Sequence, residues 1–478
     1  MLKRLSTLPP ALRQTLIYGL SLVAVKAVSL LMVPFATHFL TPADYGRLDI
    51  LQTLADLLSI VIGMGLADTL FRFTGQAKNE EEQKIVAANL LGLALIIGAV
   101  AALVTQLGAT WIVSMLPGGV TEVQVRLILG SLAMGGISTL ALSRMRMRDQ
   151  AIPYAVGSVS RVVVQAFASG LLLVLGFGVT GFMAGSFFAG SLLALWLLWP
   201  YYRDTGVRFD FDRIKQYVRY GSPLIFVGIA GFVLGSFDRW ILADAIGTAA
   251  MADYALAAKF GLITAIMIQP FDLWWLPRRF KVLPQENGPQ QCAYLGGVGV
   301  TIGISSAVMV AAIGPLLIEW LTPVSYHGAT QYVPWMAFLA VLHNTNMTLG
   351  MGSYSAKTTS WPAIIDGCAA GIAVIGYTTL IPLWGIWGTI LATAIALSAR
   401  LLATLFISQR ITHLPYAFKR LLLLFGTALI GTSALQLLEG SVQKLGVGIA
   451  LVVVIAVLAL SLKLVKISAL DRLMKRTG

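Results

Sequence analysis

The chain of 478 residues is 57% hydrophobic and only 12% charged, and it carries a formal net charge of +13. A soluble domain typically carries about 25% charged residues, so this share is too small to cover the surface of a water-soluble protein of this size. The composition therefore excludes a soluble enzyme and a disordered protein. It indicates a chain that lies mostly within a lipid bilayer.

Apolar stretches of helical length follow one another along almost the whole chain. A transmembrane helix needs about 20 mostly apolar residues, and these stretches lack the alternating pattern of barrel strands. The sequence therefore predicts an all-α polytopic membrane protein with about 14 transmembrane helices. The predicted spans are 15–39, 48–71, 85–113, 123–143, 152–175, 179–200, 220–243, 249–273, 292–318, 329–351, 360–381, 384–408, 417–438 and 445–467.

The distribution of Lys and Arg predicts how these helices are oriented. With the N-terminus inside, 26 of the 34 cations lie in cytoplasmic segments, three lie outside and five lie within spans. Such an excess is the positive-inside signal, and it indicates that both termini are cytoplasmic. Orientation and attraction to anionic membrane lipids thus account for most of the net charge. We expect no nucleic acid partner.

Similar short motifs recur in the same order in the two halves of the chain. Asp44-Tyr45 before the second span is repeated as Asp253-Tyr254 before the eighth, and Gly178-Val179-Thr180-Gly181 resembles Gly385-Ile386-Trp387-Gly388. Six spans per repeat make the repeats parallel. We therefore expect an N-lobe over 1–208 and a C-lobe over 209–412 around a central cavity. Residues 413–478 form two extra helices and a basic cytoplasmic tail.

Enzyme chemistry has little support in the loops. The predicted outer loops are short, no Walker motif is present, and Cys292 and Cys368 lie inside spans without metal-ligand spacing. The histidines are scattered along the chain. We therefore expect neither an enzyme nor a metal, and no cofactor.

Ionisable side chains within the spans are the candidate functional residues. Such groups are costly in a bilayer, so they face the protein interior and often mark a transport path. A cavity that holds several cations implies water and an anionic ligand. The cations are Lys26, Arg161, Arg239, Lys259 and Arg400, and the deeper acids are Asp56, Asp68, Asp238 and Asp366.

These charges have a second interpretation, in which they pair and hold helices together. Asp238 would then pair with another helix, and Asp366 with Arg161 or Arg400. Asp56 is either the partner of Lys26 or a site for a proton or another cation. Asp68 and Arg72, one helical turn apart, are expected to form a surface pair.

Several prolines interrupt or flank the spans, and most are expected to be ordinary kinks. Pro34 in the first span and Pro270 in the eighth lie in helices expected at the lobe interface. We predict that these two prolines allow bending during gating.

Two segments resemble a known family. Phe39-Leu40-Thr41-Pro42-Ala43-Asp44-Tyr45-Gly46 resembles the outer-loop signature of the Wzx-type lipid-linked oligosaccharide flippases, in the polysaccharide-transporter family. Phe237-Asp238-Arg239-Trp240-Ile241-Leu242 and the segment from Asp253 to Phe260 are similar to that family's pattern in spans seven and eight. This superfamily also contains multidrug extruders and lipid II flippases.

The resemblance implies a flippase of the bacterial inner membrane that moves an undecaprenyl-pyrophosphate-linked oligosaccharide to the outer leaflet. This step would serve O-antigen, exopolysaccharide or capsule biosynthesis. The resemblance implies substrate binding by Lys26, Arg239 and Lys259, with Arg161 and Arg400 as secondary candidates. A proton or sodium ion and the polysaccharide polymerase machinery are further candidate partners.

Other functions remain open on the sequence. A cation-coupled drug antiporter of the same superfamily would have an acidic cavity, whereas the cations in these spans slightly outnumber the acids. A scaffold of a polysaccharide assembly complex would share the topology without transporting anything. A glycan polymerase or ligase is disfavoured, because it usually carries a large outer loop.

Overall fold

The computed structural model describes residues 10–63, 65–354, 360–438 and 440–465. Contacts divide the chain into two compact units, Met1–Ala249 and Ala250–Gly478. All regular elements in the described residues are helices. Of the cations predicted to be cytoplasmic, Lys3, Arg4, Lys357 and those of 466–478 lie outside the described residues.

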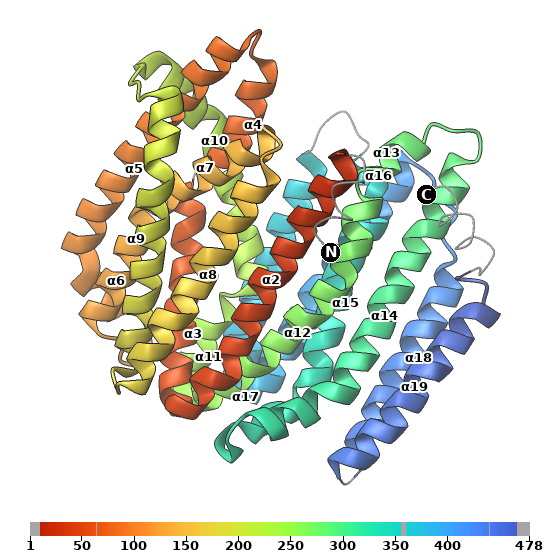
Figure 1. Ribbon diagram of the computed structural model, residues 1–478. Helices are drawn as coiled ribbons and strands as arrows, with labels where there is room; N and C mark the ends of the chain where they lie inside the picture. The colour runs from red at the N-terminus through yellow and green to blue at the C-terminus, as the bar shows by residue number, and fades with distance from the viewer. Residues whose placement is uncertain (1–9, 64, 355–359, 439, 466–478) are drawn as a thin grey trace. The chain divides into compact units, whose positions relative to one another are not determined.

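The first unit is a helical bundle that ends two residues into α12. Its long helices α8 and α9 lie side by side, as Figure 1 shows. The helices are α2 (Pro10–Phe39), α3 (Pro42–Gly63), α4 (Leu66–Gln76), α5 (Glu80–Met115), α6 (Glu122–Ala133), α7 (Gly135–Met147), α8 (Ala151–Val174), α9 (Gly178–Thr205), α10 (Phe211–Gly235) and α11 (Asp238–Ile246).

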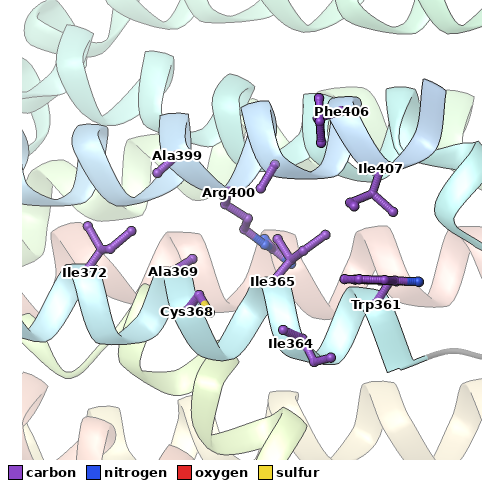
Figure 2. A pocket seen from close by; sticks show the side chains of 11 residues that line it. Trp361, Ile364, Ile365, Cys368, Ala369, Ile372, Ala399, Arg400, Phe406 and Ile407 are labelled. Atoms are coloured by element: carbon purple, nitrogen blue, oxygen red, sulfur yellow. The ribbon is translucent and has the colours of Figure 1, made fainter. Parts of the chain in front are cut away.

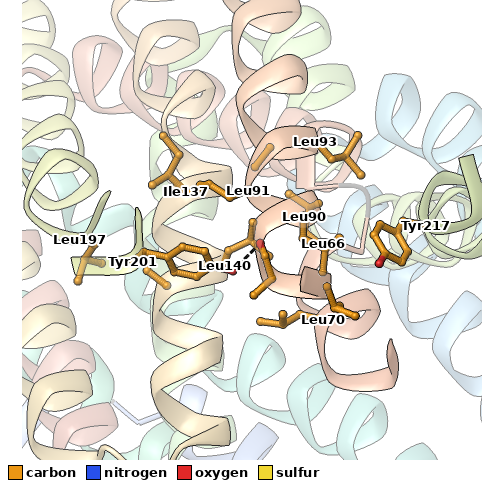
Figure 3. Packing of buried hydrophobic residues seen from close by; sticks show 14 of the residues in the cluster. Leu66, Leu70, Leu90, Leu91, Leu93, Ile137, Leu140, Leu197, Tyr201 and Tyr217 are labelled. Atoms are coloured by element: carbon orange, nitrogen blue, oxygen red, sulfur yellow. Dashed lines mark hydrogen bonds between the residues drawn. The ribbon is translucent and has the colours of Figure 1, made fainter. Parts of the chain in front are cut away.

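The apolar core of this unit joins five helices. Leu70 of α4, Leu90 of α5 and Leu140 of α7 are fully buried in it, and Figure 3 shows them packed between Tyr201 of α9 and Tyr217 of α10. The Tyr201 hydroxyl donates a hydrogen bond of 3.1 Å to a backbone carbonyl oxygen of α5. A buried hydroxyl needs such a partner, so this contact fixes α9 against α5.

The second unit is also a bundle of long helices. Its last two helices, α18 and α19, pack against each other and against α14. The elements are α12 (Thr248–Trp275), α13 (Arg279–Val282), α14 (Gly288–Leu321), the 3-10 helix η1 (Val324–Gln331), α15 (Val333–Leu349), α16 (Met351–Tyr354), α17 (Ser360–Ile411), α18 (Phe418–Gln436) and α19 (Ser441–Ser461).

The compact units and the predicted lobes are different divisions of the chain. The boundary between the units falls in the first turn of α12, so α10 and α11 group with the first unit. The lobes at 1–208 and 209–412 rest on the repeat in the sequence rather than on contacts. Those lobe boundaries stay predictions.

Twelve helices in the described part of the chain are long and apolar enough to cross a membrane. The difference from the predicted fourteen has two causes. Helix α15 has only 17 residues, because the residues before it form η1. Helix α17 merges the predicted spans 360–381 and 384–408, and it reverses direction at Gly385. Counting α15 and dividing α17 restores fourteen helices, which confirms the polytopic all-α fold.

The two arms of α17 form an antiparallel hairpin. The Tyr377 hydroxyl lies 3.1 Å from the Thr393 hydroxyl of the other arm. Gly385 at the reversal has φ 55°, and Gly178 at the start of α9 has φ 54°. L-residues with a Cβ rarely adopt this backbone. These two glycines are matched in the predicted repeat, and both have a positive φ.

Three predicted spans are broken in the first unit. The span 48–71 divides into α3 and α4 at Gly65, which has φ 61°. The spans 123–143 and 220–243 divide before Gly135 and after Gly235. Glycine lowers the cost of ending a helix. Discontinuous helices of this kind are typical of secondary transporters.

Candidate functional site

Arg239 lies in a buried charge cluster of the first unit. Its Nε lies 2.7 Å from Oδ2 of Asp49 in α3, and its Nη1 lies 3.4 Å from Oδ1 of Asp238. Nη1 also donates a hydrogen bond of 2.8 Å to the carbonyl oxygen of Gly235. The two carboxylate side chains are only 4–5% exposed and that of Arg239 is 13% exposed. The cluster therefore joins α11 to α3.

This arrangement bears on the substrate-binding role predicted for Arg239. Two carboxylates and one guanidinium give the cluster a formal charge of −1, so Arg239 is already compensated within the protein. A buried charge that loses its partner is strongly destabilising. Binding of phosphate by Arg239 stays a prediction, and the position of Asp49 makes a role in holding the helices together the better-supported one.

The outer-loop motif builds the start of α3. The Thr41 hydroxyl donates to Oδ2 of Asp44 at 2.8 Å, and it accepts a hydrogen bond from the Asp44 backbone N–H at 3.2 Å. Pro42 is the first residue of the helix, where its missing N–H has no cost. Arg47 then connects the motif to the loop before α6, through Asp44 and the carbonyl oxygen of Gly118. The motif therefore begins helix α3 and connects it to the loop before α6.

The last glycine of this motif allows close packing. A Cβ at Gly46 would overlap the backbone carbonyl oxygen of Thr248. Backbone atoms cannot rotate away as a flexible side chain can. The fit between α3 and the start of α12 therefore depends on the missing side chain.

We expect Gly46→Ala to lower the free energy of unfolding by about 1–3 kcal/mol, the usual range for forcing extra atoms into a packed site. Gly19→Ala is the matched control, because no atom of another element lies within 4 Å of a Cβ built there. Alanine is also the better helix former. Thermal unfolding of the purified protein in detergent measures both. Equal transitions for Gly46→Ala and wild type would contradict the packing argument.

Arg400 and Asp366 face each other across the α17 hairpin. Arg400 Nε donates to Asp366 Oδ1 at 2.7 Å, and Arg400 Nη1 lies 3.5 Å from Nδ1 of His343 in α15. Figure 2 shows the Arg400 side chain extending from its own arm toward the arm that carries Ile365. Of the two partners expected for Asp366, the structure places Arg400 beside it. This pair therefore ties the arms together.

A cavity of about 250 Å³ opens between the same two arms. Its walls are apolar apart from Arg400, and they include Trp361, Ile365 and Ile372 on one arm and Phe406 on the other. The guanidinium already has a carboxylate partner. This cavity therefore offers packing surface for an aliphatic chain rather than a charged binding site.

Two other predicted cations are placed differently. Lys26 is half-buried in α2, and Arg161 is exposed in the middle of α8. Among the described residues, no carboxylate lies within 4.0 Å of either side chain. Lys259 is half-buried in α12, and Asp56 is exposed in α3. The ligand roles of these four residues stay predictions.

The predicted hinges lie inside continuous helices. Helix α2 runs through Pro34, and α12 runs through Pro270. The Pro34 carbonyl oxygen accepts a hydrogen bond of 2.8 Å from the Thr37 hydroxyl and lies 2.8 Å from a ring nitrogen of His38. The bending role of both prolines stays a prediction.

The fold is shared with solved structures of a lipid flippase and of several transporters. The lipid II flippase MurJ, in an inward closed conformation, superposes with a TM-score of 0.73 at 12% identity, covering 92% of this chain and 98% of that one. A multidrug resistance MATE family transporter in its inward-facing conformation gives 0.58 at 16% identity, covering 81% and 94%. A MOP superfamily transporter from Pyrococcus furiosus gives 0.54 at 16% identity, covering 85% and 98%.

The family follows from the sequence model. The model described as "Polysaccharide biosynthesis protein" matches residues 11–280, which is more than half of the chain. The chain therefore belongs to the family of polysaccharide biosynthesis proteins, which confirms the family indicated by the outer-loop and span-seven motifs. None of the curated proteins shows significant sequence similarity to it.

Proposed function

We propose that this protein is a flippase that moves an undecaprenyl-pyrophosphate-linked oligosaccharide from the inner to the outer leaflet of a bacterial inner membrane. The observation that carries the proposal is the family match over residues 11–280, on a chain whose fold resembles that of a lipid II flippase. A polysaccharide biosynthesis protein with the fold of a transporter would act by moving a biosynthetic intermediate across the bilayer. A lipid-linked oligosaccharide is such a substrate.

The charges of the spans support an anionic substrate over a cationic drug. Lys26 and Arg161 are intramembrane cations with no carboxylate within 4.0 Å among the described residues. An uncompensated cation in a span is costly unless water or an anion solvates it. A pyrophosphate group would provide that compensation through charge-assisted hydrogen bonds.

Transport would proceed by alternating access, with the lobes 1–208 and 209–412 rocking around a central cavity and residues 413–478 outside the repeat. Pro34 and Pro270 would allow bending, and Lys259 would add to the cationic path. Asp56 is the first candidate for coupling to a proton or sodium gradient. Both termini would be cytoplasmic, and the flipped product would pass to polysaccharide polymerase machinery for O-antigen, exopolysaccharide or capsule synthesis.

Deletion of the gene tests this function. We expect loss of surface polysaccharide, accumulation of the lipid-linked oligosaccharide in the inner leaflet, and recovery of both with the wild-type gene. Purified protein in vesicles should move the same lipid between leaflets. A deletion strain with normal glycan but increased drug sensitivity would instead indicate an antiporter. Restored glycan without leaflet exchange would indicate a scaffold.

A further inference from the structure

Two arginines of the first unit stack on aromatic rings instead of pairing with acids. The guanidinium carbon of Arg72 lies 4.4 Å from the ring centre of Tyr220. That of Arg146 lies 5.3 Å from the ring centre of Phe71 and 5.8 Å from that of Tyr154. Phe71 precedes Arg72 in α4, so one turn of that helix links the two arrangements. We call these five residues the arginine–aromatic cluster.

Among the described residues, no carboxylate pairs directly with the arginines of this cluster, and the nearest acidic influence is that of Asp149 on Tyr18. No carboxylate in the described part of the chain lies within 4.0 Å of Arg72 or Arg146. The expected surface pair between Asp68 and Arg72 is therefore not formed, because Arg72 lies over Tyr220 instead. By contrast, the neighbouring Arg144 and Arg148 both reach the carboxylate of Asp204, at 2.6 and 2.9 Å.

Stacking leaves the donors of a guanidinium available. A guanidinium carries five N–H groups, and among the described residues that of Arg72 forms no hydrogen bond. Arg146 uses one of them at 3.3 Å on the hydroxyl of Ser143. The remaining N–H groups match the geometry of a phosphate, which arginine binds in a bidentate manner.

A hydroxyl without a partner lies next to the cluster. The Tyr18 ring meets that of Tyr154 edge-on, with 5.2 Å between the ring centres. Its hydroxyl is buried and forms no hydrogen bond with any described residue. Buried hydroxyls are normally satisfied, so an unmatched one indicates a missing ligand or water. A phosphate oxygen on Arg146 would supply an acceptor.

The cluster rests on a rigid support. Phe73 of α4 packs on Tyr217 of α10 with 4.8 Å between the ring centres, and Tyr217 is buried in the core drawn in Figure 3. Phe73 also meets Tyr220 edge-on at 5.9 Å. The ring under Arg72 is thus held against the core through Phe73, and this reduces the conformational entropy that a ligand must remove on binding.

We propose that the arginine–aromatic cluster binds the phosphate groups of the lipid-linked substrate before translocation. This inference rests on the proposed flippase function, and it places substrate capture at the end of the unit that the Lys and Arg distribution assigns to the cytoplasm. Arg72 and Arg146 hold the phosphates, and Tyr18 donates to a phosphate oxygen. The deeper cations act later, when the headgroup enters the membrane.

Binding of undecaprenyl pyrophosphate to the full-length protein tests the site, with phosphatidylglycerol as the competing phosphate lipid. Native mass spectrometry of the purified protein in detergent measures how much of each lipid is bound. We expect the double variant Arg72→Gln and Arg146→Gln to bind undecaprenyl pyrophosphate at least about tenfold more weakly, because it loses the charge-assisted hydrogen bonds of both arginines to phosphate. Tyr18→Phe should cause a smaller loss, and phosphatidylglycerol should bind more weakly throughout.

Arg219→Gln is the matched control. This arginine is exposed, lies beside Tyr220 on α10 and is not part of the cluster. Arg219→Gln removes one positive charge from the same end of the unit, where each substitution of the double variant also removes one, and it should bind like wild type. Equal affinity of the double variant and wild type would overturn the inference. So would an equal loss of phosphatidylglycerol binding, which would make the cluster a general phospholipid site. Cluster-dependent binding in a protein whose deletion leaves polysaccharide export intact would instead contradict the flippase function.

Discussion

Arg239→Met should lower the free energy of unfolding by about 3–5 kcal/mol, the cost of removing one partner from a buried ion pair. The substitution leaves Asp49 and Asp238, whose side chains are only 4–5% exposed, without the guanidinium between them. Methionine keeps much of the side-chain volume, so the loss reports charge rather than a cavity. Thermal unfolding of the purified protein in detergent measures it.

Two further variants separate this structural role from substrate binding. Arg219→Met is the control, because this exposed arginine lies on the adjoining helix α10. Adding Asp49→Asn and Asp238→Asn to Arg239→Met removes the uncompensated charges, and we expect it to restore most of the stability. If Arg239→Met unfolds like wild type while polysaccharide export stops, Arg239 is a substrate ligand, as the family resemblance implies.

The number and type of helices could be predicted because the bilayer constrains them strongly. A span must be long, apolar and internally hydrogen-bonded, and each of these properties is local in the sequence. Breaks within spans are a finer matter. Glycines at 65, 135 and 235 adjoin breaks, whereas α2 contains Gly19 without interruption. A glycine permits a break, and tertiary packing decides whether it occurs.

The partners of the charges could be predicted only in part. Asp366 had two candidate partners on the sequence, and the hairpin at Gly385 brings Arg400 to it. Asp49 lies within the predicted span 48–71 but was not among the predicted deeper acids. Its position seven residues before Asp56, near the same face of one helix, could have identified it as a further acid of the span. Its pairing with Arg239 depends on the packing of α11 against α3, which no local pattern encodes.

Pairing therefore divides the cations of the spans into two kinds. Arg239 and Arg400 have carboxylate partners at 2.7 Å, so their replacement should affect stability first. Lys26 and Arg161 have no carboxylate within 4.0 Å among the described residues. Their charge costs free energy in the resting protein, and a functional ligand would justify that cost. Replacing a paired cation should therefore lower stability more than transport, and replacing an unpaired one should lower transport more than stability.

Arg161→Gln is the sharpest case of the second kind. We expect polysaccharide export to fall at least about tenfold, the equivalent of about 1.4 kcal/mol of lost binding to a phosphate. The unfolding transition should stay unchanged or rise, because an uncompensated charge leaves the middle of α8. Export is measured by complementation of the deletion strain at matched protein levels.

Arg126→Gln is the control. This arginine forms an exposed pair with Glu122 within α6, and such a pair contributes little to stability. Normal export by Arg161→Gln would remove Arg161 from the substrate path, and a lowered transition would give it a structural role instead.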